Sequence, residues 1–237
     1  MWPKAYYQAS EIAHSSCAES EPGIVAAQRD IAKEEFGDRR DQELRANAYS
    51  LIAHLLAAAP SAETLERLLG ITSTESETPN NAGDNLASAW RALRDAATAA
   101  DPEQLAREYH ALFIGLGSGE IVPYASRYLT GFLNDRPLAD LRDDLAQLGF
   151  ERQPGVHEPE DHAAAVCEVM ASIVADASPD ELDQQQRFFS RHIRPWMQTL
   201  FTDLVNAPSA RFYRAVGMLG RALVEIEGRY LGVGAAS

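Results

Sequence analysis

The sequence lacks the features that mark several large classes of protein. It has only two cysteines in 237 residues, Cys17 and Cys167, which are too far apart for a metal-binding spacing and too few for a disulfide framework. Its most apolar stretch, Ala48–Ala59, is about a dozen residues long, whereas a membrane-spanning helix needs about 20. The N-terminus has no basic region followed by a long apolar run, so no secretory signal is expected. These absences predict a cytoplasmic protein without stable membrane insertion.

Basic residues are also scarce. The chain carries 21 Lys and Arg against 35 Asp and Glu, and its formal net charge is −14. A nucleic-acid-binding protein needs a basic face, so this class of function is not expected. Two interpretations of the charge stay open: an acidic surface that keeps the protein soluble, and a surface that meets a basic partner. The length allows one large domain or two small ones with a sizeable core.

Strand-like alternation is essentially absent, and helical periodicity runs through most of the chain. Apolar residues recur every three or four positions from Leu44 to Leu55, which predicts a helix. Pro60 and Ser61 are expected to end that helix and to begin another. Residues 72–85 are polar and rich in turn formers, so we expect a loop before the next helix, which starts near Leu86.

Later helix boundaries are marked by proline. Asp101-Pro102 and Ser178-Pro179 each combine an N-cap residue with a proline at the first helical position. Pro195 lies inside the helix that Ser178 begins and removes a backbone donor, so we expect that helix to kink or split near Arg191–Arg194. A last helix is expected from Ser209. The pattern as a whole predicts an all-α fold.

Three segments invite a chemical interpretation, and none fits an enzyme motif. The run Gly115–Gly119 follows a helix rather than a strand and precedes no Lys-Ser/Thr pair, so a flexible helix exit explains it better than a phosphate loop. Ser126 lacks the small residues of a hydrolase elbow, and only His110 or His162 could serve as its base, so nothing favours a catalytic triad.

The third segment is His157-Glu158-Pro159-Glu160-Asp161-His162. A zinc-binding helix places histidines four positions apart on one face, whereas these two are five apart. Pro159 is expected to mark the start of a helix, with His157 outside it and His162 in its first turn. Acids at a helix N-terminus complement the helix dipole. We therefore expect no metal site.

Several segments together resemble the TorD/DmsD family of chaperones over roughly residues 40–230. The resemblance implies an all-α, single-domain helical bundle of the TorD-like type at residues 38–232, after a variable N-terminal extension (1–37) and before a short tail (233–237). The matching segments are residues 108–115 (EYHALFIG), 123–128 (PYASRY), 138–149 (LADLRDDLAQLG), 158–162 (EPEDH), 192–196 (HIRPW) and 212–213 (FY).

The resemblance implies a cytoplasmic chaperone with no cofactor and no catalytic residues. Such a chaperone binds the twin-arginine signal peptide and the apo form of a molybdoenzyme, of the formate dehydrogenase or dimethyl-sulfoxide-reductase type, and assists cofactor insertion before Tat export. A monomer and a domain-swapped dimer are both compatible with it. Two other functions stay open: a helical protein that binds or hydrolyses a nucleotide such as GTP, and an unrelated helical interaction module.

By position, the resemblance places the peptide-binding surface on the PYASRY and EPEDH segments. Carboxylates bind arginine through charge-assisted bonds, so Glu158 and Asp161 are candidates to recognise it. For Asp161 a second role is equally open, in which it caps the neighbouring loop. A histidine such as His162 is more often structural than a ligand contact, and it is included because it follows Asp161 in the family motif. Family members usually carry a more apolar residue, often Trp, where this chain has Tyr124. The predicted site residues are Pro123, Tyr124, Ser126, Tyr128, Glu158, Pro159, Asp161 and His162.

Overall fold

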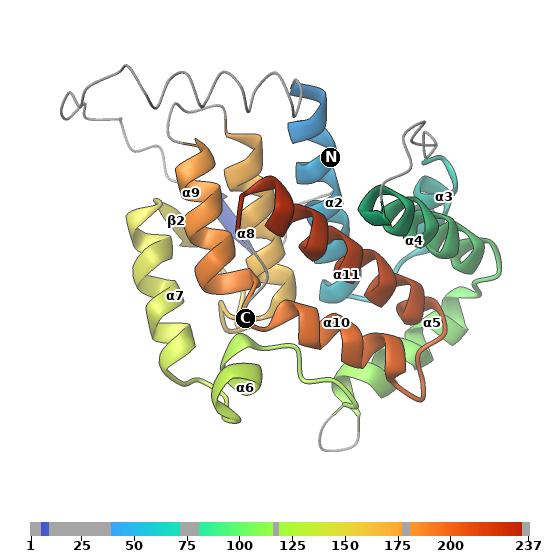
Figure 1. Cartoon of the computed structure of the whole chain (residues 1–237). Coiled ribbons are helices and arrows are strands. Elements are labelled where there is room, and N and C mark those ends of the chain that lie inside the picture. The colour runs from blue at the N-terminus through green and yellow to red at the C-terminus, as the bar shows by residue number, and fades with distance from the viewer. Residues whose placement is uncertain (1–5, 10–38, 72–80, 116–118, 177–180, 234–237) are drawn as a thin grey trace.

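The computed structural model describes residues 6–9, 39–71, 81–115, 119–176 and 181–233 as a bundle of helices around a common core (Figure 1). Its only sheet within these residues has two short strands. In chain order the elements are β1 (Tyr7–Ala9), α2 (Arg39–Ala57), α3 (Ala62–Leu69), α4 (Asn81–Thr98), α5 (Pro102–Tyr109), the π-helical turn η1 (His110–Ile114), α6 (Ala125–Thr130), α7 (Arg136–Gln147), β2 (Phe150–Arg152), α8 (Ala163–Ala175), α9 (Glu181–Phe188), the π-helical turn η2 (Phe189–Ile193), α10 (Met197–Asn206) and α11 (Phe212–Tyr230).

Helices α2 and α8 pack along each other in the middle of the bundle (Figure 1). Helix α8 is buried on almost every side: of its thirteen residues only Ser172 and Ala175 are not buried. A helix that is apolar all round belongs in a protein interior. The sequence AAAVCEVMASIVA therefore places α8 at the centre of the bundle. The loop that leads into α8 is held in place by this buried helix.

Helices α10 and α11 cross closely because glycine lies between them. A Cβ atom on Gly220 would lie 2.3 Å from the ring of Phe201, and one on Gly217 would lie 2.9 Å from the Phe201 carbonyl oxygen. Phe201 is 1% exposed. The missing side chains let the aromatic ring of α10 pack directly against the backbone of α11.

A buried ion pair connects three helices. Arg45 of α2 donates to both carboxylate oxygens of Glu227 on α11 and, at 2.8 Å, to the side-chain oxygen of Gln185 on α9. The ring of Tyr230 lies 3.9 Å below the Arg45 guanidinium. Glu227 is fully buried, so its charge depends on this partner.

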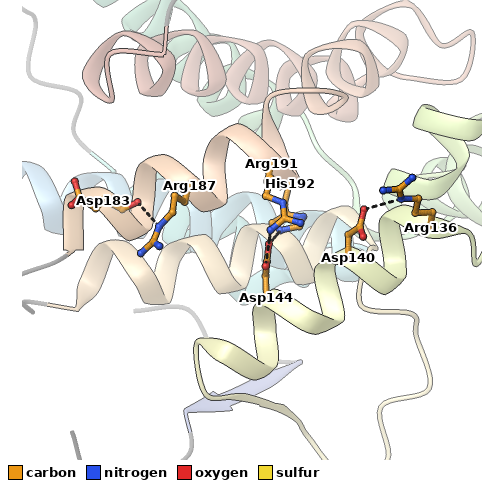
Figure 2. Close-up of polar contacts among 7 residues, drawn as sticks. All are labelled: Arg136, Asp140, Asp144, Asp183, Arg187, Arg191 and His192. Carbon is orange, nitrogen blue, oxygen red and sulfur yellow. Dashed lines mark hydrogen bonds and ion pairs between the residues drawn. The ribbon is translucent and has the colours of Figure 1, made fainter. Parts of the chain in front are cut away.

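Helix α7 is attached to η2 by a shared carboxylate, as Figure 2 shows. Asp144 accepts hydrogen bonds from His192 at 2.6 Å and from Arg191 at 2.8 Å. Beside this contact a groove of about 520 Å³ lies between α7 and α9, with Leu148 and Phe188 among its lining residues. The sequence patterns did not predict this groove.

Several predicted boundaries are confirmed. The Ser61 hydroxyl caps α3 by accepting from the Thr64 N–H at 3.2 Å, and the Asp101 carboxylate caps α5 by accepting from the Gln104 N–H at 2.9 Å. The predicted break near Pro195 is also present, because η2 ends at Ile193 and α10 begins at Met197. Of the residues that the structure describes, no helix is both long and apolar enough to cross a membrane.

Other expectations need correction. Helix α4 already begins at Asn81, inside the predicted loop 72–85, of which residues 72–80 lie outside the described residues. The predicted cap at Ser178-Pro179 also lies outside them. Pro159 does not start α8, which begins at Ala163. The two strands were not expected, because a three-residue strand is too short to show alternation.

Candidate functional site

The PYASRY and EPEDH segments lie side by side. The Ala125 N–H donates to the Asp161 carbonyl at 2.9 Å, and the Ala163 N–H donates to the Pro123 carbonyl at 2.8 Å. Tyr124 and His162 face each other between these two bonds as an antiparallel bridge. The two segments that carry most of the resemblance are thus joined by their backbones.

Asp161 holds the start of α6. Its carboxylate accepts a hydrogen bond from the Ser126 N–H at 2.9 Å. The residue is 1% exposed, and its second oxygen, Oδ1, is buried without a partner among the described residues. This geometry is that of the capping role, which was one of the two predicted for Asp161.

Ser126 and Pro123 are buried as well. The Ser126 hydroxyl accepts from the Asp135 N–H at 3.3 Å, and so connects the two ends of the α6–α7 turn. Pro123 contributes its carbonyl to the bridge described above. Both residues therefore hold the backbone of the site in place, and their side chains are buried in this structure.

Glu158 is the accessible carboxylate of the site. It is half-buried and accepts a hydrogen bond from the Tyr124 hydroxyl. Burial, and then the nearby charge of Asp161, raise the pKa of Glu158 above its usual value. A carboxylate whose charge is poorly compensated gains from a cation that arrives from solution.

His162 is the N-cap of α8 rather than part of its first turn. Its Nδ1 accepts from the Ala164 N–H at 3.2 Å, so the proton of the neutral ring is carried by Nε2. Burial lowers the pKa of His162 to about 4, which keeps the imidazole neutral at pH 7. The Tyr124 ring packs edge-on against it, with centroids 5.1 Å apart.

Tyr128 forms the other end of the PYASRY segment. Its hydroxyl donates to the carboxylate of Asp203 on α10 at 3.0 Å, and its ring lies 5.6 Å from that of the buried Trp196. Asp203 is exposed. Sequence reasoning missed Asp203, since only the fold brings α10 next to α6.

The N-terminal strand also reaches the site. Tyr6 stacks on His162, and the N–H groups of Tyr6 and Tyr7 donate to Glu168 on α8, each at 3.0 Å. Strand β1 pairs antiparallel with β2. Sequence reasoning did not predict Tyr6 as part of this region, because residues 1–37 carry little periodicity. It did not predict Glu168 either, because only the fold brings α8 next to the N-terminal segment.

The remaining residues of the EPEDH segment are structural. The Pro159 carbonyl accepts from the His162 N–H at 3.1 Å. Glu160 forms ion pairs with Arg142 at 2.7 Å and with Arg152 at 3.7 Å. No group of three or more potential metal ligands occurs in the described ranges.

The glycine segment is described only at its ends. Residues 116–118 lie outside the described residues. Gly115 adopts a φ of 58° at the end of η1, and a Cβ atom on Gly119 would lie 2.3 Å from the Leu112 carbonyl oxygen. A positive φ at Gly115 and close backbone packing at Gly119 thus account for the glycines at the two ends.

Comparison with known proteins identifies the family. Residues 80–202 match the sequence profile of the nitrate reductase delta subunit family. The chain belongs to this family. The TorD chaperone of Vibrio atlanticus is 26% identical over 209 residues, which cover 80% of this chain and 95% of that protein. The TorD chaperone of Vibrio parahaemolyticus is 26% identical over 210 residues, with the same coverage.

The predicted resemblance to TorD is therefore confirmed, and the protein is a chaperone of this family rather than an enzyme. The all-α fold is confirmed too. A putative redox enzyme maturation protein from Archaeoglobus fulgidus has the same fold, with a TM-score of 0.51 at 18% identity, covering 80% of this chain and 95% of that one.

Proposed function

We propose that this TorD-family chaperone binds the twin-arginine signal peptide of a molybdoenzyme in the cytoplasm and assists cofactor insertion before export. The observation that carries the proposal is the joined PYASRY and EPEDH surface, on which Glu158 stays accessible beside aromatic rings. The proposed client is the apo form of a formate dehydrogenase or dimethyl-sulfoxide-reductase type enzyme.

Two carboxylates of this surface suit two arginines. Glu158 accepts from Tyr124, and Asp203 accepts from Tyr128, four residues later. Each carboxylate has spare acceptor capacity, because an ionised carboxylate offers about four lone-pair sites. A guanidinium can bind such a group through two parallel N–H bonds. Asp161 contributes to peptide binding indirectly, because its carboxylate holds the start of α6 in place.

The aromatic rings suit the apolar part of the peptide. Tyr124 and Tyr128 are half-buried and keep their hydroxyls bonded to carboxylates, so part of each ring is available for apolar contact. A signal peptide has a basic head followed by an apolar stretch. Charged and aromatic groups in one place can bind both parts, and this fits the resemblance to the family.

Calorimetry with a synthetic peptide tests the proposal. The peptide carries an Arg-Arg pair followed by an apolar segment, and a Lys-Lys version serves as the control ligand. We expect Glu158→Gln to weaken binding of the Arg-Arg peptide about tenfold, roughly 1.4 kcal/mol. Glu66→Gln removes the same charge from an exposed position on α3 and should leave the affinity unchanged. Equal losses in both variants would mean that only net charge matters.

The client needs a separate experiment. Affinity capture of the tagged chaperone from its native host, followed by mass spectrometry, should recover a precursor with a twin-arginine signal. Recovery of partners without such a signal would favour an unrelated interaction module.

A further inference from the structure

Tyr6, which directly precedes β1, contacts part of the proposed peptide site. The Tyr6 ring stacks on His162 with ring centroids 6.2 Å apart and planes inclined by 20°. The charge of Glu158 is the second cause, after burial, of a raised pKa of the Tyr6 phenol, so the two side chains share one neighbourhood. The segment that begins at Tyr6 therefore borders the proposed site at His162.

Glu168 anchors this segment. It lies on α8, is 6% exposed, and accepts hydrogen bonds from two successive backbone N–H groups, those of Tyr6 and Tyr7, at 3.0 Å each. A buried carboxylate requires such donors. A guanidinium group presents two parallel N–H donors to a carboxylate. An arginine side chain can therefore take the place of the two backbone amides.

The edge of β2 provides the backbone partners. The Gln153 N–H donates to the Tyr6 carbonyl at 2.8 Å, and the register places Tyr7 opposite Arg152 and Gln8 opposite Glu151. Among the described residues, β2 pairs with no other strand. If β1 leaves, this edge presents unpaired groups to which an extended peptide can add as a strand.

The pairing of β1 with β2 is weak enough for a peptide strand to replace β1. A two-stranded sheet with three residues in each strand has little stability of its own. Tyr7 is 3% exposed, and its hydroxyl is buried without a hydrogen-bond partner among the described residues. An unpaired buried hydroxyl is unfavourable and offsets part of the gain from burying the ring.

We propose that Glu168 and the edge of β2 form a second part of the peptide site. Residues 6–9 occupy it in this structure, and an extended, arginine-bearing segment of the client displaces them. This inference rests on the proposed function and adds a specific acceptor, Glu168, and a competing segment of the chain itself.

A reversible covalent lock tests the exchange in the full-length chain. The double variant Gln8→Cys/Glu151→Cys, in a Cys17→Ser background, places two cysteines directly opposite each other in an antiparallel pair, a spacing that a disulfide can bridge. Cys167 is buried and stays outside this chemistry. We expect oxidation to weaken binding of the Arg-Arg peptide by at least about tenfold, and reduction to restore it. The Glu151→Cys single variant, treated identically, should show no change.

The failures of the two proposals are distinguishable. Equal affinity of the oxidised and reduced lock overturns the exchange but leaves the proposed function standing. A reduced lock and a wild-type protein that both fail to bind the Arg-Arg peptide overturn the proposed function and the exchange together.

Hydrogen exchange gives a second test that needs no substitution. Saturation of the wild-type protein with the Arg-Arg peptide should increase the exchange rates of the Tyr6 and Tyr7 amides, because Glu168 no longer accepts from them. Unchanged or slower exchange of these amides in the complex would overturn the proposal.

Discussion

The Asp161 carboxylate accepts a hydrogen bond from the backbone N–H of Ser126 at 2.9 Å, across 35 positions of sequence. An acid of the EPEDH segment thereby orients the first turn of α6, on which Tyr128 lies. The position of the half-buried Tyr128 therefore depends on a carboxylate that solvent hardly reaches.

Substitution of Asp161 should destabilise the fold. We expect Asp161→Ala to lower the free energy of unfolding by about 2–3 kcal/mol, because a buried N–H loses a charged acceptor. Urea denaturation measures this loss. Asp143→Ala, which removes an exposed acid from α7, should change it by less than about 0.5 kcal/mol. An Asp161→Ala protein of wild-type stability that binds peptide poorly would instead make Asp161 a direct arginine contact.

Stability should fall in acid because His162 is neutral in the folded state. Its pKa is lowered to about 4, whereas in the unfolded chain it is about 6.5. The unfolded state thus binds more protons between these values, and the free energy of unfolding decreases as pH falls from 6.5 toward 4, by up to about 1.4 kcal/mol per unit.

The matched variant is His162→Asn, which retains an N-cap acceptor without a titrating group. Urea denaturation at several pH values should show a shallower pH dependence for it than for the wild type over this window. Parallel curves would assign the acid sensitivity to other groups, such as His192.

For the buried pair of Arg45 and Glu227, a single substitution should destabilise the fold more than substitution of both residues. Arg45→Met leaves the fully buried Glu227 charge without its partner, which should cost about 3–5 kcal/mol. Arg45→Met/Glu227→Leu removes both charges and should recover most of that loss. Chemical denaturation of the wild type, of Arg45→Met, of Glu227→Leu and of the double variant measures the coupling, and additive losses would contradict it.

Helix α11 should not tolerate a side chain at Gly220. The added Cβ of Gly220→Ala meets the Phe201 ring, so we expect a loss of roughly 1–3 kcal/mol in thermal or urea unfolding. Phe201→Leu in the same protein should return part of it by making room. At Gly70, where the nearest atom would be 3.5 Å away, substitution by Ala should be nearly neutral. Equal effects at both glycines would mean that helix packing is not the cause.

The sequence predicted correctly those helix boundaries that depend on interactions between residues close together in the chain. The caps at Ser61 and Asp101 and the break at Pro195 follow from hydrogen bonds and φ restrictions within a few residues. The start of α8 was predicted too early, at Pro159. The intervening residues are occupied by the bridge to Pro123 and Tyr124, a contact that no local pattern contains.

By itself the sequence predicted an all-α chain that resembles the TorD family, because helical periodicity and motif order are properties of the linear chain. Only the tertiary structure decided which of the predicted acids faces outward. Glu158 stays accessible while Asp161 is 1% exposed, although they are three positions apart. The same holds for Asp203, Glu168 and β1, since burial and contacts between distant segments arise from the packing of α6, α8 and α10.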